Sequence, residues 1–237
     1  QIDMDSPASQ VSLFHDIEAN FPDLTYYDAD ISIGTRYMAR HGIFPLALCE
    51  LEADENQVIQ SIRALNTRWD LMPNLPPLRI FELQPDCDPT RAMPGSLLMR
   101  TDRFARSLPL DPAGDYLRQI NEALASYDPD IFVTDWGDIW LIPFLDAQSE
   151  ETCIPLQLNR DATRPVRWQK ETSYFSYGHI IYRPEEAHLF GRCHVDRKSS
   201  MMWSDYRLAG TLEMARITTL SIEKAARVSP GQGISAM

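Results

Sequence analysis

The residues of this chain best suited to metal chemistry are carboxylates that lie close together in the sequence. Asp86 and Asp88 form a D-x-D pair, and Asp135 and Asp138 flank a Trp-Gly dipeptide. Hard cations such as Mg²⁺ prefer carboxylate oxygens, so either pair could contribute to a metal site. Both pairs also have a structural interpretation. Prolines around the first pair indicate a loop, and Asp138 could cap the helix expected to follow the second.

Histidine and cysteine are the usual zinc ligands, and several lie in the C-terminal third of the chain. His179, His188, Cys193 and His194 do not have the spacing of a zinc-binding motif, so we expect no zinc site. The four cysteines of the chain are widely spaced and form no C-x-x-C pair. This usage indicates reduced cysteines, as in a cytoplasmic protein.

Two groups of basic residues could contact phosphate. Arginine and lysine make many of the backbone contacts in protein–DNA complexes, although a solvated loop is an equally good interpretation. The candidate DNA-binding residues are Arg160, Arg164, Arg167 and Lys170 around Trp168, and a weaker second group of Arg192, Arg197 and Lys198.

The elements that must position these residues follow from the apolar pattern. Three prolines between residues 73 and 77 separate a small N-terminal subdomain from a longer region in which strands alternate with helices. Such alternation predicts an α/β domain with a mixed sheet. In the N-terminal subdomain we expect helices at 10–20 and 33–41, a strand at 43–51, and either a helix or a strand at 55–66. In the longer region we expect strands at 78–83, 96–100, 130–134 and 192–195, helices at 111–127, 137–147 and 197–227, a hairpin at 173–184, a loop at 157–173 and a helix end at 229–233.

Composition and charge limit the possible classes of protein. Hydrophobic residues make up 44% and charged residues 24% of the 237 residues, which is typical of a globular protein. The net charge is −12, but residues 151–237 carry +3, which leaves −15 for residues 1–150. Such an acidic first half argues against a free-standing nucleic-acid binder, though not against a module of a larger protein.

The sequence also bears on membrane insertion and on the extent of the chain. No apolar run approaches the ~20 residues that a membrane helix needs, so we expect no membrane partner. The acidic first residues are unlike a signal or transit peptide. The chain begins with Gln, which is compatible with a piece of a longer protein.

Four segments resemble stretches of family B DNA polymerases, in the order that the family has them. DPDIFVTDWGDIWLIPFL at 128–145 resembles the second exonuclease motif, whose usual form is DPD-I-I-x-x-YNGD-x-FD-x-PYL. YYDADISIGTRYMARHGIFPL at 26–46 resembles the segment that precedes the exonuclease domain. GRCHVD at 191–196 is similar to a GR-x-H-x-D strand, and residues 218–233 resemble the exit toward the polymerase palm.

This resemblance implies the fold and the domain boundaries. We expect an RNase H-like 3′–5′ exonuclease fold, a mixed central sheet flanked by helices, over residues 77–237, which ends in the connector to the polymerase domain. Residues 1–76 would form a small α+β N-terminal subdomain. The polymerase motifs DxxSLYP and YxDTD do not occur in the chain, so we do not expect it to polymerise DNA alone.

The resemblance also implies where catalytic carboxylates should stand. Such exonucleases use two divalent metals held by four carboxylates, two of them from a D-x-E whose residues share one face of a strand. Only one carboxylate remains at the matching positions, and it is a Glu in place of an Asp, so we expect no intact catalytic or metal site. The matching residues are Glu82 and Gln84 in the first motif, Trp136 and Leu141 in the second, and Tyr206 and Gly210 in the third.

We therefore expect a catalytically inactive exonuclease-like domain that serves as a scaffold and contacts DNA through the complete polymerase. Trp136 and Leu141 would fill the vacated pocket, or Trp136 would stack on an unpaired base. One alternative is a residual Mg²⁺- or Mn²⁺-dependent exonuclease using Glu82 with Asp135 or Asp138; otherwise we expect no cofactor. The other alternative is an acidic α/β domain that binds a replication or repair protein. The resemblance implies a cytoplasmic, nucleoid-associated protein of a prokaryote.

Overall fold

A computed structural model describes residues 10–27, 31, 33–176 and 179–235. The chain divides into two compact units, Gln1–Leu71 and Met72–Met237. The division therefore follows residue 71, whereas the proline pattern predicted a boundary after residue 76. Within the described residues, no helix has the length and apolar character needed to cross a membrane.

The described residues of the N-terminal unit form two helices and a hairpin. The helices α1 (Gln10–Asn20) and α2 (Ile33–His41) lie where the apolar spacing predicted them. The strands β1 (Cys49–Ala53) and β2 (Ile59–Ala64) pair antiparallel. Segment 55–66, for which the sequence allowed either a helix or a strand, therefore contains a strand. Of the strand expected at 43–51, only residues 49–51 belong to a strand, β1.

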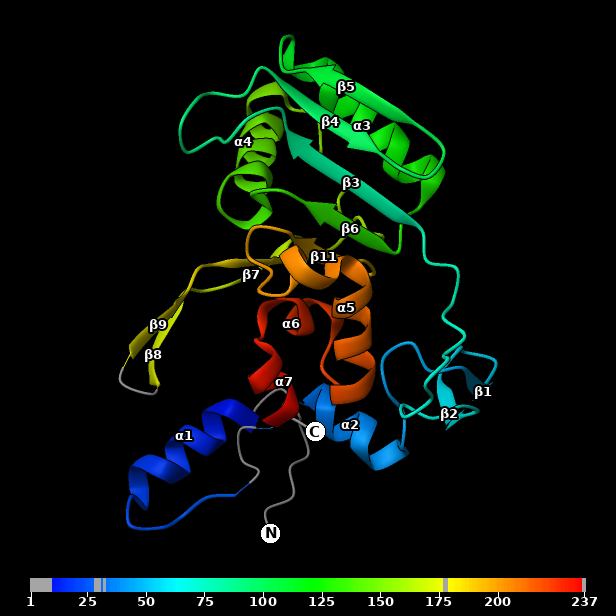
Figure 1. Ribbon diagram of the computed structural model, residues 1–237, viewed down its shortest axis with the longest axis vertical. Helices are drawn as coiled ribbons and strands as arrows, with labels where there is room; N and C mark the ends of the chain where they lie inside the picture. The colour runs from blue at the N-terminus through cyan, green and yellow to red at the C-terminus, as the bar shows by residue number, and fades with distance from the viewer. Residues whose placement is uncertain (1–9, 28–30, 32, 177–178, 236–237) are drawn as a thin grey trace. The chain divides into compact units, whose positions relative to one another are not determined.

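The second unit is built on a mixed five-stranded sheet, which confirms the predicted α/β class (Figure 1). The strand order is β11-β6-β3-β4-β5; β11, β6 and β3 are parallel, and β4 and β5 continue the sheet antiparallel. The strands are β3 (Ile80–Pro85), β4 (Ser96–Arg100), β5 (Ala105–Pro109), β6 (Ile131–Thr134) and β11 (Cys193–Asp196).

The hydrophobic core lies between one face of this sheet and two helices, α3 (Ala113–Tyr127) and α4 (Ile142–Thr152). Phe81 and Leu83 of β3 are fully buried in this core. Successive side chains of a strand point to opposite faces, so Glu82 and Gln84 lie on the other face, where they are only partly buried. The i, i+2 spacing therefore places these two polar side chains side by side.

The second unit also contains a π-helical turn and two short antiparallel strand pairs. A single π-helical turn, η2 (Gly137–Leu141), leads into α4. Residues 157–173, expected to be a loop, contain β7 (Arg167–Gln169), which pairs with β10 (Glu186–His188). The expected hairpin is formed by β8 (Thr172–Ser176) and β9 (His179–Arg183); its turn lies outside the described residues.

The C-terminal part of the second unit is helical. It contains α5 (Trp203–Thr218), α6 (Ile222–Arg227) and α7 (Pro230–Ser235). The helical segment expected at 197–227 ends at Arg227, but Pro230 then begins a further short helix in the stretch expected only to end it, at a position where proline is well tolerated.

Candidate functional site

The candidate site lies where the parallel strands β3, β6 and β11 end. Carboxyl ends of parallel strands form the usual place for a site in an α/β sheet. Asp135 follows β6, and its backbone N–H donates to the carbonyl of Leu83 at 3.4 Å. Arg197 follows β11, and its backbone N–H donates to the carbonyl of Thr134 at 2.8 Å. The sheet itself therefore brings these two side chains to the edge where Gln84 stands.

The guanidinium of Arg197 lies among the polar side chains of this edge. Its Nη2 donates to Oε1 of Gln84 at 2.7 Å, and its Nη1 donates to Oε2 of Glu82 at 3.4 Å. Its Nε lies 2.5 Å from Oδ1 of Asp135. The Arg197 side chain is only 17% exposed, and the two carboxylates are 29% and 23% exposed. Three nitrogens of one arginine thus face three different side chains.

The second motif places an apolar residue in the core and an aromatic one at its edge. Leu141, at the position matched to a metal-binding Asp, is fully buried in the core cluster. Trp136 precedes the π-helical turn with a left-handed backbone (φ 59°) and is partly buried. The ammonium of Lys198 lies 5.2 Å from the centre of the Trp136 ring. Leu141 thus fills the core, whereas Trp136 is only partly buried and the Lys198 ammonium lies over its ring.

The third motif leaves no room for a carboxylate. Tyr206 is exposed, and Gly210 lies four residues further along α5, beyond a kink at Arg207 where φ is 54°. A Cβ atom placed on Gly210 would overlap the Cβ of Tyr206. In this conformation of α5, glycine is therefore required where the resemblance places an Asp.

Asp138, one of the candidate metal ligands, is buried in an ion pair instead. Its Oδ2 lies 2.9 Å from Nη2 of Arg227, and its Oδ1 accepts the backbone N–H of Ala187 at 2.9 Å. The Nε of Arg227 lies 3.4 Å from Oε1 of Glu186. Asp138 does not cap the following helix, so the interpretation of this residue as a helix cap was wrong. Sequence patterns did not point to Arg227, which is 89 residues away.

A buried histidine completes this polar region. The ring of His194 makes hydrogen bonds to the carbonyl of Ala187 and to Oγ1 of Thr134, each at 2.8 Å. Because a carbonyl only accepts, Nδ1 carries the proton and Nε2 accepts from the threonine. Burial lowers the pKa of His194 and favours this neutral ring. A Cβ on Gly137 would overlap the Thr134 hydroxyl, so glycine is needed against this pair.

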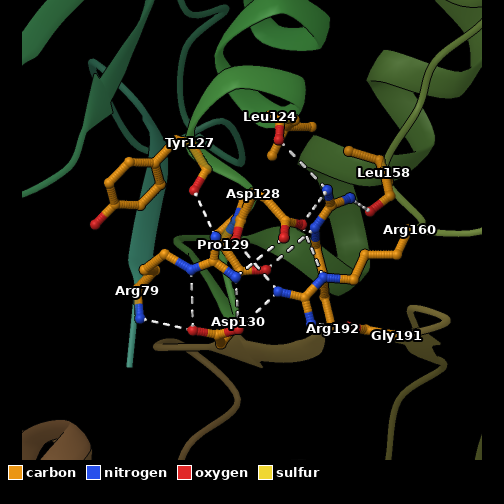
Figure 2. A network of polar contacts seen from close by, with 10 residues as sticks. All are labelled: Arg79, Leu124, Tyr127, Asp128, Pro129, Asp130, Leu158, Arg160, Gly191 and Arg192. Carbon is orange, nitrogen blue, oxygen red and sulfur yellow. Dashed lines mark hydrogen bonds and ion pairs between the residues drawn. The ribbon is translucent and has the colours of Figure 1, made fainter. Parts of the chain in front are cut away.

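The Asp-Pro-Asp sequence of the second motif anchors a separate cluster of three arginines, shown in Figure 2. Asp130 Oδ1 accepts from Nη2 of Arg160 at 2.6 Å, and its Oδ2 accepts the backbone N–H of Arg79 at 2.9 Å. Asp128 pairs with Arg160 at 2.8 Å and with Arg79 at 3.0 Å. The buried Arg192 donates to the carbonyl of Leu158 at 2.6 Å. Arg160 and Arg192, both considered as phosphate contacts, have these internal partners.

The other basic candidates lie closer to solvent. Arg167 and Lys170 are exposed at and just after β7, and Trp168 between them is partly buried against the core. The guanidinium of Arg164 lies 4.7 Å from the centre of the Phe190 ring. The candidates for phosphate contact are therefore split between internal and exposed positions.

The donors present do not fit a pair of divalent metals. No group of three or more His, Cys, Asp or Glu side chains that could hold a metal occurs in the described part of the chain. Asp86 and Asp88, the alternative pair, brace their own loop: Asp86 accepts from Ser96 at 3.1 Å, and Asp88 accepts from Thr90 at 2.7 Å. Glu82 and Asp135 remain, and a guanidinium lies beside both.

Comparisons with known proteins show the fold of the chain. No protein-family model and no curated protein matches it. Among solved structures, it is similar to the family B DNA polymerase from the hyperthermophilic archaeon Pyrobaculum calidifontis, with a TM-score of 0.61 and 17% sequence identity. The match covers 98% of this chain and 38% of that polymerase. Along almost its whole length, this chain therefore has the fold of part of a family B DNA polymerase.

Proposed function

We propose that this chain is the N-terminal and exonuclease-like region of a family B DNA polymerase, and that its exonuclease site is inactive. Four sequence segments in the family's order and a structural likeness over 98% of the chain support this assignment. Residues 77–237 would be the RNase H-like domain, and residues 1–76 the N-terminal subdomain. Polymerisation, replication or repair would belong to the complete protein.

The position of Arg197 carries the proposal that catalysis is lost. Two divalent metals bring four positive charges and need several carboxylates around them. Here Glu82 and Asp135 offer two, and a guanidinium lies beside both. Leu141 in the core and the crowded Gly210 cannot supply the missing ligands. This donor set, taken over the described residues, is too small to hold the two metals that would activate water and stabilise a leaving 3′ oxygen.

The remaining role that we propose is contact with DNA. Arg167 and Lys170 are exposed, and Lys198 lies over Trp136 beside the former site. Exposed cations bind phosphate without sequence preference, and the face of a tryptophan ring is a surface on which a base can stack. Arg160 and Arg197 have acidic partners within the domain, which favours an internal role for both.

Residual exonuclease activity is the second candidate function. It is favoured by one observation, that Glu82 and Asp135 retain carboxylates on the same sheet edge, where one arginine reaches both. A single metal held there would give slow, metal-dependent cleavage.

A nuclease assay separates the two. The chain in molar excess is incubated with 5′-labelled single-stranded DNA and Mg²⁺ or Mn²⁺, beside the Glu82→Ala variant. The proposal expects no shortening in either metal by either protein. Shortening from the 3′ end that requires metal and disappears in Glu82→Ala would overturn it. A nuclease contaminant is recognised because it persists in the variant.

A further inference from the structure

We infer that the guanidinium of Arg197 is a built-in replacement for the metal cations of an exonuclease site, and that its removal turns Glu82 and Asp135 into a divalent-cation site. The inference rests on the proposed function, because it takes this sheet edge to be the former metal site. It adds that the guanidinium of Arg197 itself prevents metal binding, in addition to the loss of carboxylate ligands.

The first argument is the shape of the contact. A divalent metal requires oxygens that converge on a point, at about 2.0–2.1 Å for Mg²⁺. The oxygens of Glu82, Gln84 and Asp135 instead each face a different nitrogen of one planar group, at 2.5–3.4 Å. Glu82 and Gln84 accept hydrogen bonds from the guanidinium and Asp135 forms an ion pair with it, so the three side chains are arranged around one planar cation and not around a metal ion.

The second argument is charge. Glu82 and Asp135 carry two negative charges on a partly buried edge, and Gln84 adds none. The single positive charge of Arg197 offsets one of these two negative charges and leaves the other uncompensated. The amide at position 84 suits this arrangement, because it accepts a hydrogen bond and keeps the negative charge low.

The third argument is that Arg197 is held in place. Its backbone N–H continues the parallel ladder to the Thr134 carbonyl, and its guanidinium lies 5.8 Å from the centre of the Trp203 ring. The side chain is 17% exposed, so it has little freedom to leave. The next residue, Lys198, adds a further positive charge nearby, which disfavours a second cation.

Removing the guanidinium tests the inference. In Arg197→Gln the charge is lost and a polar side chain remains, so two uncompensated carboxylates share the edge. Arg197→Lys keeps the charge and should bind no metal. Arg160→Gln is the matched control, because it also removes an arginine from two aspartates, but Arg79 and Arg192 remain there.

Mn²⁺ binding to the full chain is measured by isothermal titration calorimetry, and thermal melting is followed with and without MnCl₂. We expect one Mn²⁺ per chain in Arg197→Gln, with Kd about 0.1–1 mM, as for weakly charged oxygen sites. Mn²⁺ should raise the melting temperature of that variant alone. Adding Gln84→Glu to it should tighten binding about tenfold, since affinity rises with ligand charge. The unchanged chain, Arg197→Lys and Arg160→Gln should show no saturable binding.

Several results would overturn the inference. One is a folded Arg197→Gln variant that binds no Mn²⁺, and another is an unchanged chain that binds it equally well. A variant that unfolds but is refolded by Mn²⁺ supports it, whereas one that stays unfolded in Mn²⁺ contradicts it. Nuclease activity of the unchanged chain would overturn the proposed function whatever the variants bind. An inactive chain whose Arg197→Gln variant ignores Mn²⁺ would overturn only this inference.

Discussion

The carboxylate of Asp130 should make a major electrostatic contribution to the stability of this domain. The substitution Asp130→Asn tests this contribution. The carboxylate joins the start of β6 to two distant segments, through Arg79 just before β3 and Arg160 in the loop before β7. Asparagine has nearly the same shape but no charge. Its amide group also presents N–H donors to at least one arginine that is itself a donor.

The magnitude follows from the pKa of the carboxyl. Burial raises the pKa of Asp130, but hydrogen bonds from Arg79 and Arg160 outweigh burial and hold the pKa at about 2, against an ordinary 3.8. Each pKa unit corresponds to 1.36 kcal/mol, so the ionised form gains about 2 kcal/mol in the folded state, and about 1 kcal/mol after solvent screening. Because the folded pKa is the lower one, this stability is present above about pH 4 and is lost as the pH falls toward 2.

The assay is urea unfolding followed by circular dichroism at a series of pH values from 7 down to 2.5. Asp130→Asn should lower the free energy of unfolding by about 1–2 kcal/mol at pH 7, and the difference from the unchanged chain should shrink below pH 4. Asp146→Asn, at an exposed carboxylate of α4, serves as the control and should change little. Equal stability of Asp130→Asn at pH 7, or a difference that persists unchanged at the lowest pH, would refute the reasoning.

Three further substitutions test the packing around the former site. Leu141→Ala should cost about 2–5 kcal/mol in urea unfolding, because the side chain is fully buried, and a cost under about 0.5 kcal/mol would contradict its place in the core. Gly210→Ala should cost about 1–3 kcal/mol through overlap with the preceding turn, whereas Gly231→Ala, which meets no atom within 4 Å, should be nearly neutral; equal melting temperatures would argue against the crowding. Thr134→Val should cost about 1–3 kcal/mol by leaving Nε2 of His194 without its hydrogen-bond partner, and an unaffected chain would contradict this buried hydrogen bond.

Much of the fold could be predicted from local patterns. The apolar run Ser96–Arg100 gave β4 at its observed bounds, and the spacing of apolar residues gave α3. The strand β5 was missed because only Leu108 of its five residues is buried, and an edge strand of this kind leaves little apolar alternation to detect. The short pair β7 and β10 was missed because three residues are too few to show a period.

The candidate site could be predicted only in part. The i, i+2 rule placed Glu82 and Gln84 on one face, and the structure agrees. It could not identify Arg197 as their partner, because the arginine follows them by 115 and 113 residues and reaches them only through the strand order. The sequence offered Arg160 as a candidate phosphate contact and did not show its partners Asp128 and Asp130, because they lie 32 and 30 residues away. A sequence shows charge along the chain, whereas ion pairs such as that of Arg160 with Asp130 depend on which strands become neighbours.

The most direct test of the central claim is a crystal structure of the unchanged chain grown with millimolar MnCl₂ and measured at the manganese absorption edge. The account predicts electron density for the Arg197 guanidinium between Glu82, Gln84 and Asp135, and no anomalous peak at that sheet edge. A manganese peak bound by Glu82 and Asp135, with Arg197 turned away, would contradict it and would show that this sheet edge takes up a divalent metal.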